Sequence, residues 1–495
     1  MSAARVEPSD REFFGAVADV AFGNPFSRER AAAIARLVPD APGDLTSDRE
    51  ALARVVAPRL ERVLRDGPSA VERLGDEERR VVETALLYVR YHRYVPQIDA
   101  LIARQADKGG APLGVPFGDE VMADLVNDGF VAERAGRYLA SFFQLRRAFY
   151  FIQGSLAGEC ESMRRLREAL WNNVFTHDMR GYEAALWGRM EDFSTLILGE
   201  TGTGKGSAAA AIGRSEFIPY VPGERRFVTN FAESFIAINL SQFPETLIES
   251  ELFGHRKGAF TGAIDHHQGV FERCSQHGAL FLDEIGEVSI PAQIKLLQVL
   301  QERTFTPLGG HEKRRFSGRV IAATNRHLDE LRREGRFRDD FFYRLCSDVI
   351  QVPTLRQRIT ESPAELPQLV RSLVARVIGI ESSELVATVL EALDSVPRGY
   401  AWPGNVRELE QAVRRVLLTG RYAPELRHVA PNEEAAFSEK LHAGELTAAE
   451  LLSRYCALLY RRLGTYAEVA KRTGLDPRTS RKYVTVGLNV RKHGP

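Results

Sequence analysis

GETGTGK, at residues 199–205, follows the apolar segment TLIL (195–198) and opens the Ala-rich stretch KGSAAAAIG (205–213). Closely spaced glycines let backbone N–H groups curl around phosphate oxygens, and a following helix turns the positive end of its dipole toward them. The lysine of such a loop places its ammonium on the β- and γ-phosphates. A surface turn is the alternative, but the strand before and the helix after favour a phosphate-binding loop in an α/β core.

The predicted phosphate contacts are Gly199, Glu200, Thr201, Gly202, Thr203, Gly204, Lys205, Gly206 and Ser207. In the common pattern a Ser or Thr follows the lysine and binds Mg²⁺, whereas Gly206 stands here. Ser207 is one residue further on, which rotates it by about 100° around a helix. We therefore expect water to fill that Mg²⁺ position.

Two further apolar runs end in polar pairs. Asp283 and Glu284 follow ALFL (279–282), and Thr324 and Asn325 follow VIAA (320–323). Ligands of such folds sit at the carboxyl ends of the strands. We expect Asp283 to hold Mg²⁺ and Glu284 to polarise the attacking water. Asn325 would orient that water or sense the γ-phosphate, with a simple strand-end cap as the alternative.

Composition excludes several classes of protein. The 495 residues contain 66 Lys and Arg and 66 Asp and Glu, which argues against a uniformly basic nucleic-acid coat and against an acidic tail protein. The four Cys include no CxxC pair, so neither a disulfide scaffold nor a zinc site is expected. The charged N-terminus does not resemble a signal peptide, and no apolar run reaches about 18 residues. These features predict a soluble, cytoplasmic, multidomain chain without a membrane span.

The texture of the sequence divides the chain into five parts. The first part of the chain has helical periodicity, interrupted by turn signals at 41–43 and 109–112. In the next part, short apolar runs alternate with helical stretches, which is typical of a parallel βαβ sheet. Helical periodicity then returns toward the C-terminus. The predicted parts are a helical region 1–178, an α/β core 179–354, a helical lid 355–429, a polar linker 430–446 and a small helical unit 447–495.

The stretch ETLIESELFGHRKGAFTGA (245–263) contains the hexapeptide Gly258, Ala259, Phe260, Thr261, Gly262 and Ala263. This hexapeptide resembles the signature of the AAA+ activators of sigma-54 RNA polymerase, the bacterial enhancer-binding proteins. The likeness continues through 269–310 and RVIAATN (319–325), and returns in GRFRDDFFYRL (335–345) and WPGNVRELEQAV (402–413). It covers roughly residues 195–420.

The resemblance assigns roles to individual residues. It implies that Lys205 is the Walker A lysine and that Asp283 and Glu284 are the Walker B pair. It further implies that Asn239 holds the catalytic glutamate between turnovers and that Thr324 and Asn325 form sensor I. The remaining assignments are Arg338 and Arg344 as arginine fingers that reach a neighbour's ATP, and Arg407 as the sensor II arginine of the lid. Surface solvation or an ordinary ion pair is the alternative for the two fingers.

Within the hexapeptide, two glycines flank Phe260 and Thr261, which is typical of a contact loop rather than a plain turn. The resemblance implies that this loop contacts sigma-54 and moves with the nucleotide state. Two departures from the family follow. Gly206 replaces its usual Glu, which argues for slower hydrolysis, and residues 215–233 are longer than usual, which suggests an added surface loop.

The last unit carries helix-start signals at Thr447–Glu450 and Thr465–Glu468, a turn glycine at 474 and the pair Asp476-Pro477. Nine basic and two acidic residues lie between 461 and 495. This pattern resembles the Fis-like helix-turn-helix of the family, with a helical hairpin tail as the alternative. The residues predicted to reach a DNA groove are Arg478, Thr479, Arg481 and Lys482.

The N-terminal region shows no receiver pattern of alternating strands and helices with strand-end aspartates. Tyr88, Tyr91 and Tyr94, with Arg90 and His92 between them, could line a ligand pocket or simply form a packed helix face. In the family this region senses a signal and controls ring assembly. Whether it binds a small molecule or a protein stays open.

The sequence thus predicts an activator that hydrolyses ATP with Mg²⁺, binds upstream DNA and remodels sigma-54 RNA polymerase to open promoters. We expect it to work as a homo-oligomeric, hexameric ring. A nucleotide-binding and DNA-binding regulator that does not remodel polymerase is the first alternative, and Gly206 is its best support. The second alternative is an AAA+ remodeller of another protein.

Overall fold

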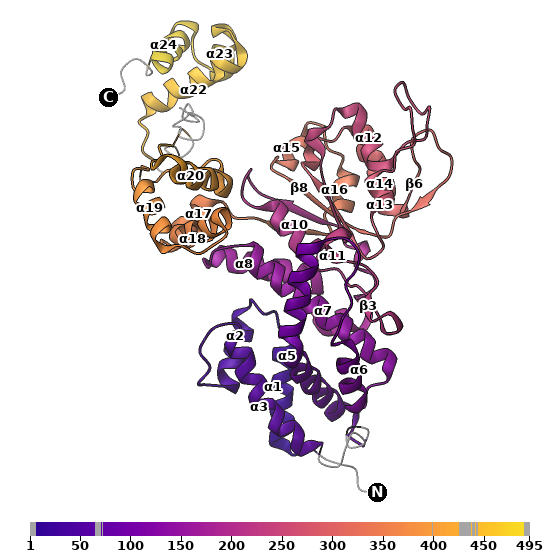
Figure 1. Cartoon of the computed structure of the whole chain (residues 1–495). Helices are drawn as coiled ribbons and strands as arrows, with labels where there is room; N and C mark the ends of the chain where they lie inside the picture. Colours follow the sequence, from indigo (N-terminus) through magenta and orange to yellow (C-terminus); the bar gives the residue numbers. More distant parts are fainter. Residues whose placement is uncertain are drawn as a thin grey trace. The chain divides into compact units, whose positions relative to one another are not determined.

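The computed structural model describes residues 6–64, 71, 73–397, 399–424, 437, 441 and 444–489. The chain divides into two compact units, residues 1–422 and 423–495 (Figure 1). Most of the predicted linker 430–446, and the basic residues Arg491 and Lys492, lie outside the described residues. Within those residues, no helix combines the length and apolar character that a membrane span needs.

The N-terminal region is helical, as predicted. Its long helices are α1 (Pro8–Phe22), α2 (Arg28–Leu37), α3 (Ser47–Val63), α5 (Asp76–Lys108), α6 (Gly118–Asn127), α7 (Ala132–Ser155) and α8 (Glu161–Phe175). The two predicted turn signals fall between α2 and α3 and between α5 and α6. The short turns α9 (Met179–Gly181), η1 (Tyr182–Leu186) and η2 (Met190–Asp192) lead into the sheet.

A five-stranded parallel sheet forms the α/β core. Its strands are β1 (Thr195–Leu198), β4 (Phe235–Asn239), β5 (Ala279–Asp283), β8 (Arg319–Thr324) and β9 (Asp348–Gln351), in the order β4-β5-β8-β1-β9. The strands expected from the apolar runs 195–198, 279–282 and 320–323 are confirmed as β1, β5 and β8. The fifth, β9, escaped prediction because three of its four residues are exposed. The register pairs Asn239 with Asp283 and Leu198 with Thr324, so the predicted polar residues line one edge.

The two faces of this sheet are covered by different parts of the chain. Ile197, Phe281 and Ile321 point to one core, which also contains α10 (Lys205–Gly213), α7 and α8. The alternate residues point to a second core. That core is built with α12 (Glu245–Phe253), α13 (Val270–Arg273), α14 (Ile290–Glu302), α15 (Leu328–Arg333) and α16 (Asp339–Leu345). The N-terminal helices therefore provide part of the packing of the sheet.

The stretch 215–233 is not the surface loop that we expected. It forms the hairpin β2 (Tyr220–Val221) and β3 (Arg226–Phe227) and the turn α11 (Phe231–Ser234). Phe227 and Phe231 are each only 1% exposed, and the ring of Phe227 stacks on Phe143 of α7 at 4.0 Å. The expectation was wrong because the partner of these aromatic residues is the N-terminal helix α7.

Four helices build the predicted lid: α17 (Leu355–Glu361), α18 (Glu365–Ile378), α19 (Ser383–Leu393) and α20 (Asn405–Thr419). They share an apolar core that includes Trp402. Residues 425–429, at the end of the predicted lid, lie outside the described residues.

Residues 444–489 of the second unit form three helices, α22 (Ala448–Leu463), α23 (Tyr466–Thr473) and α24 (Pro477–Asn489), around Cys456, Val469 and Val484. The capping box predicted at Thr447 and Glu450 is present in both directions. The last helix begins at Pro477, within the predicted start signal Asp476-Pro477, and ends at Asn489. At Gly487 an added Cβ would lie 2.2 Å from the carbonyl oxygen of Ser453, so α22 and α24 approach closely there.

Candidate nucleotide-binding site

The loop 199–205 has the conformation that phosphate binding requires. Gly202 and Gly204 have φ angles of 79° and 105°, in the left-handed region that favours glycine. The Nζ of Lys205 donates to the carbonyl oxygens of Gly199 at 2.8 Å and Glu200 at 3.2 Å. Burial lowers the pKa of Lys205, Glu284 and Asp283 raise it, and Arg407 lowers it. The predicted lysine, both carboxylates and the lid arginine therefore act on one another electrostatically.

The acidic pair lies where β5 ends. An oxygen of Asp283 accepts a hydrogen bond from the N–H of Glu284 at 3.0 Å. Glu284 itself has φ 58° and ψ 46°, which is left-handed and unusual for a residue with a side chain. In this conformation its Oε2 lies 3.4 Å from the backbone N–H of Asn325, at the end of the neighbouring β8.

The sensor I pair connects β8 to the phosphate loop. The Nδ2 of Asn325 donates to the hydroxyl of Thr201 at 2.8 Å. The hydroxyl of Thr324 is buried and accepts from the N–H of Arg326 at 3.1 Å. Asn325 is thus placed to connect the loop tip with the carboxylate of Glu284.

The start of α20 lies directly on the phosphate loop. The N–H of Arg407 donates to the carbonyl oxygen of Gly202 at 3.3 Å. An added Cβ at Gly202 would lie 2.2 Å from the carbonyl oxygen of Gly404, so the second glycine of the loop is needed for contact with the lid as well as for its φ angle.

Two lid residues that the sequence reasoning missed complete this contact. The Nδ2 of Asn405 donates to Glu200 Oε2 and to the carbonyl oxygen of Thr201, both at 3.1 Å. Arg356 forms an ion pair with Glu200, with Nη1 2.8 Å from Oε2, and this bond lowers the pKa of Glu200. Asn405 stands in the quoted stretch GNVREL, so its position was visible although its role was not.

Gly206 and Ser207 are exposed in the first turn of α10. An added Cβ at Gly206 would meet only Cε1 of Phe281, at 4.0 Å. The site therefore has room for a larger residue or for water at this position.

Asn239 pairs with Asp283 across β4 and β5, so it reaches the edge that carries the carboxylates. Its amide oxygen accepts from the N–H of Ser241 at 3.0 Å and from the hydroxyl of Ser241 at 2.7 Å. In this structure the side chain caps the turn η4 (Leu240–Gln242) rather than holding Glu284.

The two predicted finger arginines lie at the ends of α16. The guanidinium of Arg338 pairs with Asp340 at 2.7 Å and is exposed. Arg344 donates through Nε and Nη2 to the carbonyl oxygen of Leu300, at 3.0 and 2.7 Å. Within this chain both side chains have partners outside the cluster of Lys205 and Glu284.

The hexapeptide 258–263 forms a tight loop. The N–H of Gly258 donates to the carbonyl oxygen of Ala263 at 2.8 Å, and Gly258 and Gly262 have φ angles of 81° and 103°. Thr261 is exposed, and Phe260 is 37% exposed with its ring 5.0 Å from that of His255. The loop therefore presents an apolar and a hydroxyl side chain to solvent.

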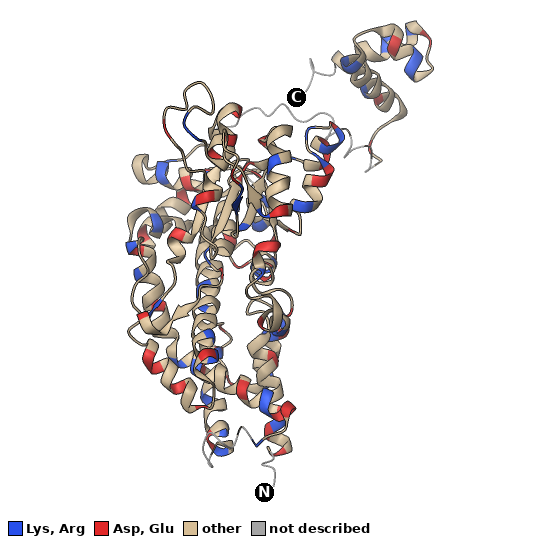
Figure 2. Ribbon diagram, turned by 90° about the vertical axis from the view of Figure 1, so that its right-hand side faces the viewer, with Lys and Arg blue, Asp and Glu red and all other residues tan. Residues whose placement is uncertain are grey.

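In the second unit, α24 carries the predicted DNA-contact residues. Arg478, Arg481 and Lys482 are exposed, and the N–H of Thr479 donates to Asp476 at 3.1 Å. Arg481 lies over the ring of Tyr466 at 5.5 Å. Figure 2 shows that basic and acidic residues are interspersed along the ribbon of the larger unit.

A family profile described as "Sigma-54 interaction domain" matches residues 181–351. The DNA-binding transcriptional regulator NtrC of Azospirillum brasilense is 44% identical over 225 residues, which cover 46% of this chain and 43% of that protein. The Nif-specific regulatory protein of Azotobacter vinelandii is 34% identical over 359 residues, which cover 70% of this chain and 61% of that protein. The chain spans about half the length of the curated relatives it matches.

A crystal structure of NtrX from Brucella abortus in complex with ADP aligns with 79% of this chain and 86% of its own. The identity is 22% and the TM-score is 0.40.

Proposed function

Residues 181–351 belong to the sigma-54 interaction domain family, and on that premise we propose that the protein is an ATP-hydrolysing activator that remodels sigma-54 RNA polymerase. The match confirms the resemblance that the hexapeptide and its neighbouring motifs predicted. The observation that carries the proposal is the joining of loop, carboxylates and sensor in one site: Asn325 bonds both Thr201 and Glu284.

The residues of the site divide the work of ATP hydrolysis. The loop N–H groups and Lys205 hold the phosphates, with Arg407 close enough to influence the charge of Lys205. Glu284 polarises the attacking water, and Asn325 keeps that carboxylate in register with the loop tip. Arg356 and Asn405 hold the lid on Glu200, so nucleotide binding and lid position are coupled.

The site also fits Mg²⁺. Asp283 supplies the hard carboxylate oxygen that Mg²⁺ prefers, and the open space at Gly206 admits water to complete the ligand set. Bound there, the ion would neutralise charge on the phosphates.

We place the second half of the ATPase on a neighbouring copy. Arg338 is the N-cap residue of α16, and Arg344 lies near the end of that helix. Both side chains have partners outside the cluster of Lys205 and Glu284, which suits a role in trans. An arginine supplied in this way is worth roughly 10³–10⁵ in rate. Such a dependence on a neighbour favours a closed ring, and we propose a hexamer.

The exposed Phe260 and Thr261 would make the contact with sigma-54, and the second unit would bind upstream DNA through α24. Exposed cations on one helix of a small three-helix unit support the DNA proposal. The family match and the loop geometry support the sigma-54 proposal.

Steady-state ATP hydrolysis tests the enzymatic part of the proposal. The wild type at ring-forming concentration should release phosphate with Mg²⁺ present, and Lys205→Ala should not. Absence of activity in the wild type under those conditions would favour the alternative that Gly206 supports, a regulator that binds nucleotide and DNA without remodelling polymerase.

A further inference from the structure

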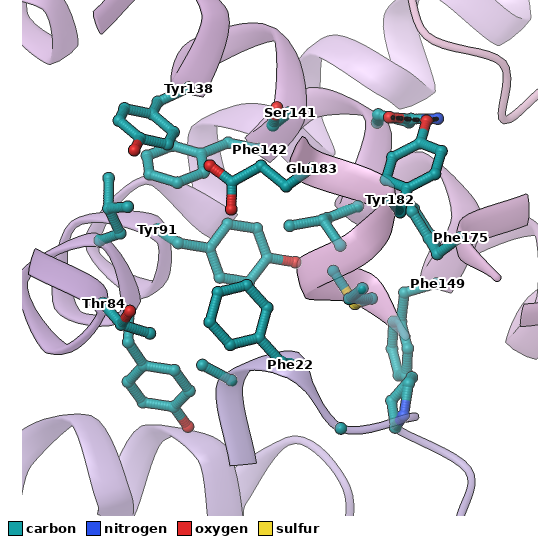
Figure 3. A pocket seen from close by; sticks show the side chains of 18 of the residues that line it. Phe22, Thr84, Tyr91, Tyr138, Ser141, Phe142, Phe149, Phe175, Tyr182 and Glu183 are labelled. Atoms are coloured by element: carbon teal, nitrogen blue, oxygen red, sulfur yellow. Dashed lines mark hydrogen bonds between the residues drawn. The ribbon is translucent and has the colours of Figure 1, made fainter. Parts of the chain in front are cut away.

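A cavity of about 130 Å³ lies among the N-terminal helices. Its wall is rich in aromatic side chains and is drawn from α1, α2, α3, α5, α7, α8, α9 and η1. Figure 3 shows the rings of Phe22, Tyr91, Phe142 and Phe149 gathered around it. Of the aromatic residues that the sequence singled out on α5, Tyr88 and Tyr91 line the cavity, whereas the hydroxyl of Tyr94 bonds to Asp124.

Two arginines in this wall are buried, and neither has a carboxylate partner among the described residues. Arg30 and Arg49 are 8% and 6% exposed. Arg30 donates Nε to the carbonyl oxygen of Val20 at 2.7 Å. Nε and Nη2 of Arg49 have no hydrogen-bond partner within the part of the chain that the structure describes, and the guanidinium lies over the ring of Phe149 at 4.1 Å.

Burying a charged group without an oppositely charged partner is unfavourable. The two arginines in the cavity wall therefore favour the binding of an anion there. Burial lowers the pKa of Arg49 to about 9, with Arg30 adding to the effect, and leaves the group charged at neutral pH. Burial, together with the charges of Arg49, Arg30 and Arg146, holds the pKa of His92 well below its usual range, so the imidazole adds no charge.

The other titratable groups of the wall do not cancel the two charges. Glu183 lies 3.8 Å from Arg137, which lines the cavity as well, and its pKa is raised by burial. The hydroxyls of Tyr88, Tyr91, Tyr138 and Tyr182 are neutral, because their pKa values are raised. The wall as a whole therefore offers two cations to an anion, and Glu183 disfavours a second negative charge on it.

We propose that this cavity binds a small monoanionic carboxylic acid with a single flat ring, whose carboxylate is held by Arg30 and Arg49. Guanidinium groups bind carboxylates through paired hydrogen bonds. The volume suits one ring, since an apolar protein cavity of roughly 150 Å³ is known to hold benzene. The aromatic wall would stack on the flat ring of the ligand.

The cavity wall is connected to the ATPase core. The amide of Gln144, also in the wall, exchanges hydrogen bonds with the hydroxyl of Tyr182 at 2.8 and 3.0 Å. The same amide donates to the carbonyl oxygen of Ser215, just beyond α10, at 3.0 Å. A ligand packed against Tyr182 would therefore contact a hydrogen-bond network that runs through Gln144 to Ser215, next to the C-terminal end of α10.

Binding of benzoate to the full-length protein tests the proposal without any ATPase assay. Trp171 and Trp187 line the cavity and report on it by fluorescence. Benzoate should change this fluorescence and raise the unfolding temperature. Benzamide has the same size but no charge, and it should bind at least about 30-fold more weakly, the loss typical of removing one partner of a buried charge pair.

Three variants locate the effect. Arg49→Met should lose the benzoate response, whereas Arg54→Met, which changes an exposed arginine on the same helix, should keep it. Ser141→Leu fills the cavity while leaving both arginines in place, and it should also abolish binding. The proposal fails if the wild type shows no response up to about 10 mM benzoate, a concentration that reveals even weak specific binding. It fails equally if benzamide binds as well as benzoate or if Ser141→Leu binds normally.

Discussion

At the scale of single residues, the backbone of Glu284 is the most telling feature of the site. Its left-handed conformation costs roughly 1–3 kcal/mol, and such costs persist where the surrounding structure enforces them. The conformation brings the carboxylate toward the N–H of Asn325 and away from the continuing line of β5. The strained backbone therefore positions the carboxylate of Glu284, the proposed catalytic group.

Replacing Glu284 by Gln should lower the rate of ATP hydrolysis by at least about 100-fold, because an amide cannot polarise water as a carboxylate does. Binding of a fluorescent ATP analogue should persist, since Lys205 and the loop are untouched. Glu287→Gln is the matched control. Glu287 lies in the turn that follows Glu284 and forms an ion pair with Arg326, and we expect it to be dispensable for the chemical step. If both variants lose ATP hydrolysis to the same extent, Glu284 is not the residue that polarises the attacking water.

Two substitutions at Gly206 separate its backbone effect from its missing side chain. Gly206→Ala should stabilise the protein by about 0.5–1 kcal/mol, because the helix loses a glycine and the added Cβ meets open space. Gly206→Ser should be similarly stable and should also reach half-maximal ATPase at a lower Mg²⁺ concentration. Identical Mg²⁺ titrations for the two variants would show that a hydroxyl here does not reach the ion.

A site residue could be predicted from the sequence when the motif that identifies it is contiguous along the chain. Lys205, Asp283 and Glu284 were predictable because the motif and its strand are contiguous in sequence. Arg356 and Asn405 were not, since their contacts with Glu200 span 156 and 205 residues. Asn239 was expected to hold the catalytic glutamate, whereas its side chain caps η4 in this structure.

At the scale of elements, the hairpin of β2 and β3 with α11 connects the sheet to the N-terminal helices. The Nδ2 of Asn230 donates to the carbonyl oxygen of Gly110 at 3.0 Å, and Phe231 lies edge-on to Phe151 of α7. The sequence indicated that residues 215–233 are an insertion, but it did not indicate where they pack. Apolar residues in a short segment do not reveal which surface will bury them. The parallel strands were easier to predict, since each is a continuous apolar run.

Phe227→Ala should lower the free energy of unfolding by about 3–5 kcal/mol, the usual cost of deleting a buried aromatic ring. Val228→Ala, one residue along and 45% exposed, should change it by less than about 0.5 kcal/mol. Chemical denaturation of the two variants measures both effects. A small effect at Phe227 would mean that the hairpin is not packed on α7 as described.

At the scale of the whole molecule, the N-terminal region and the ATPase core are one packed body. Arg319 of β8 is 2% exposed and donates to the carbonyl oxygen of Asn173 in α8 at 2.9 Å and to that of Phe193 at 3.0 Å. Arg147 of α7 donates to the carbonyl oxygens of Arg214 and Glu216, both at 2.7 Å. Composition and periodicity predicted the helices but not that they share a core with the sheet.

Two deletions should therefore behave differently. Removing residues 1–178 would uncover the apolar face of α10 and of the sheet, so the product should aggregate or unfold without cooperativity. Removing residues 423–495 deletes a separate compact unit, so the rest should fold and keep its ATPase activity while losing DNA retention. A soluble, cooperatively folded 179–495 fragment would contradict the shared core.

The central claim is that ATP hydrolysis drives the hexapeptide loop against sigma-54. Open-complex formation on a sigma-54 promoter, with purified full-length protein, polymerase and ATP, measures it directly. The wild type should open the promoter. Thr261→Ala should hydrolyse ATP but leave the promoter closed, because Thr261 is exposed in the loop and lies outside the nucleotide site. Promoter opening by Thr261→Ala at the wild-type level, or a wild type that hydrolyses ATP without opening the promoter, would contradict the claim.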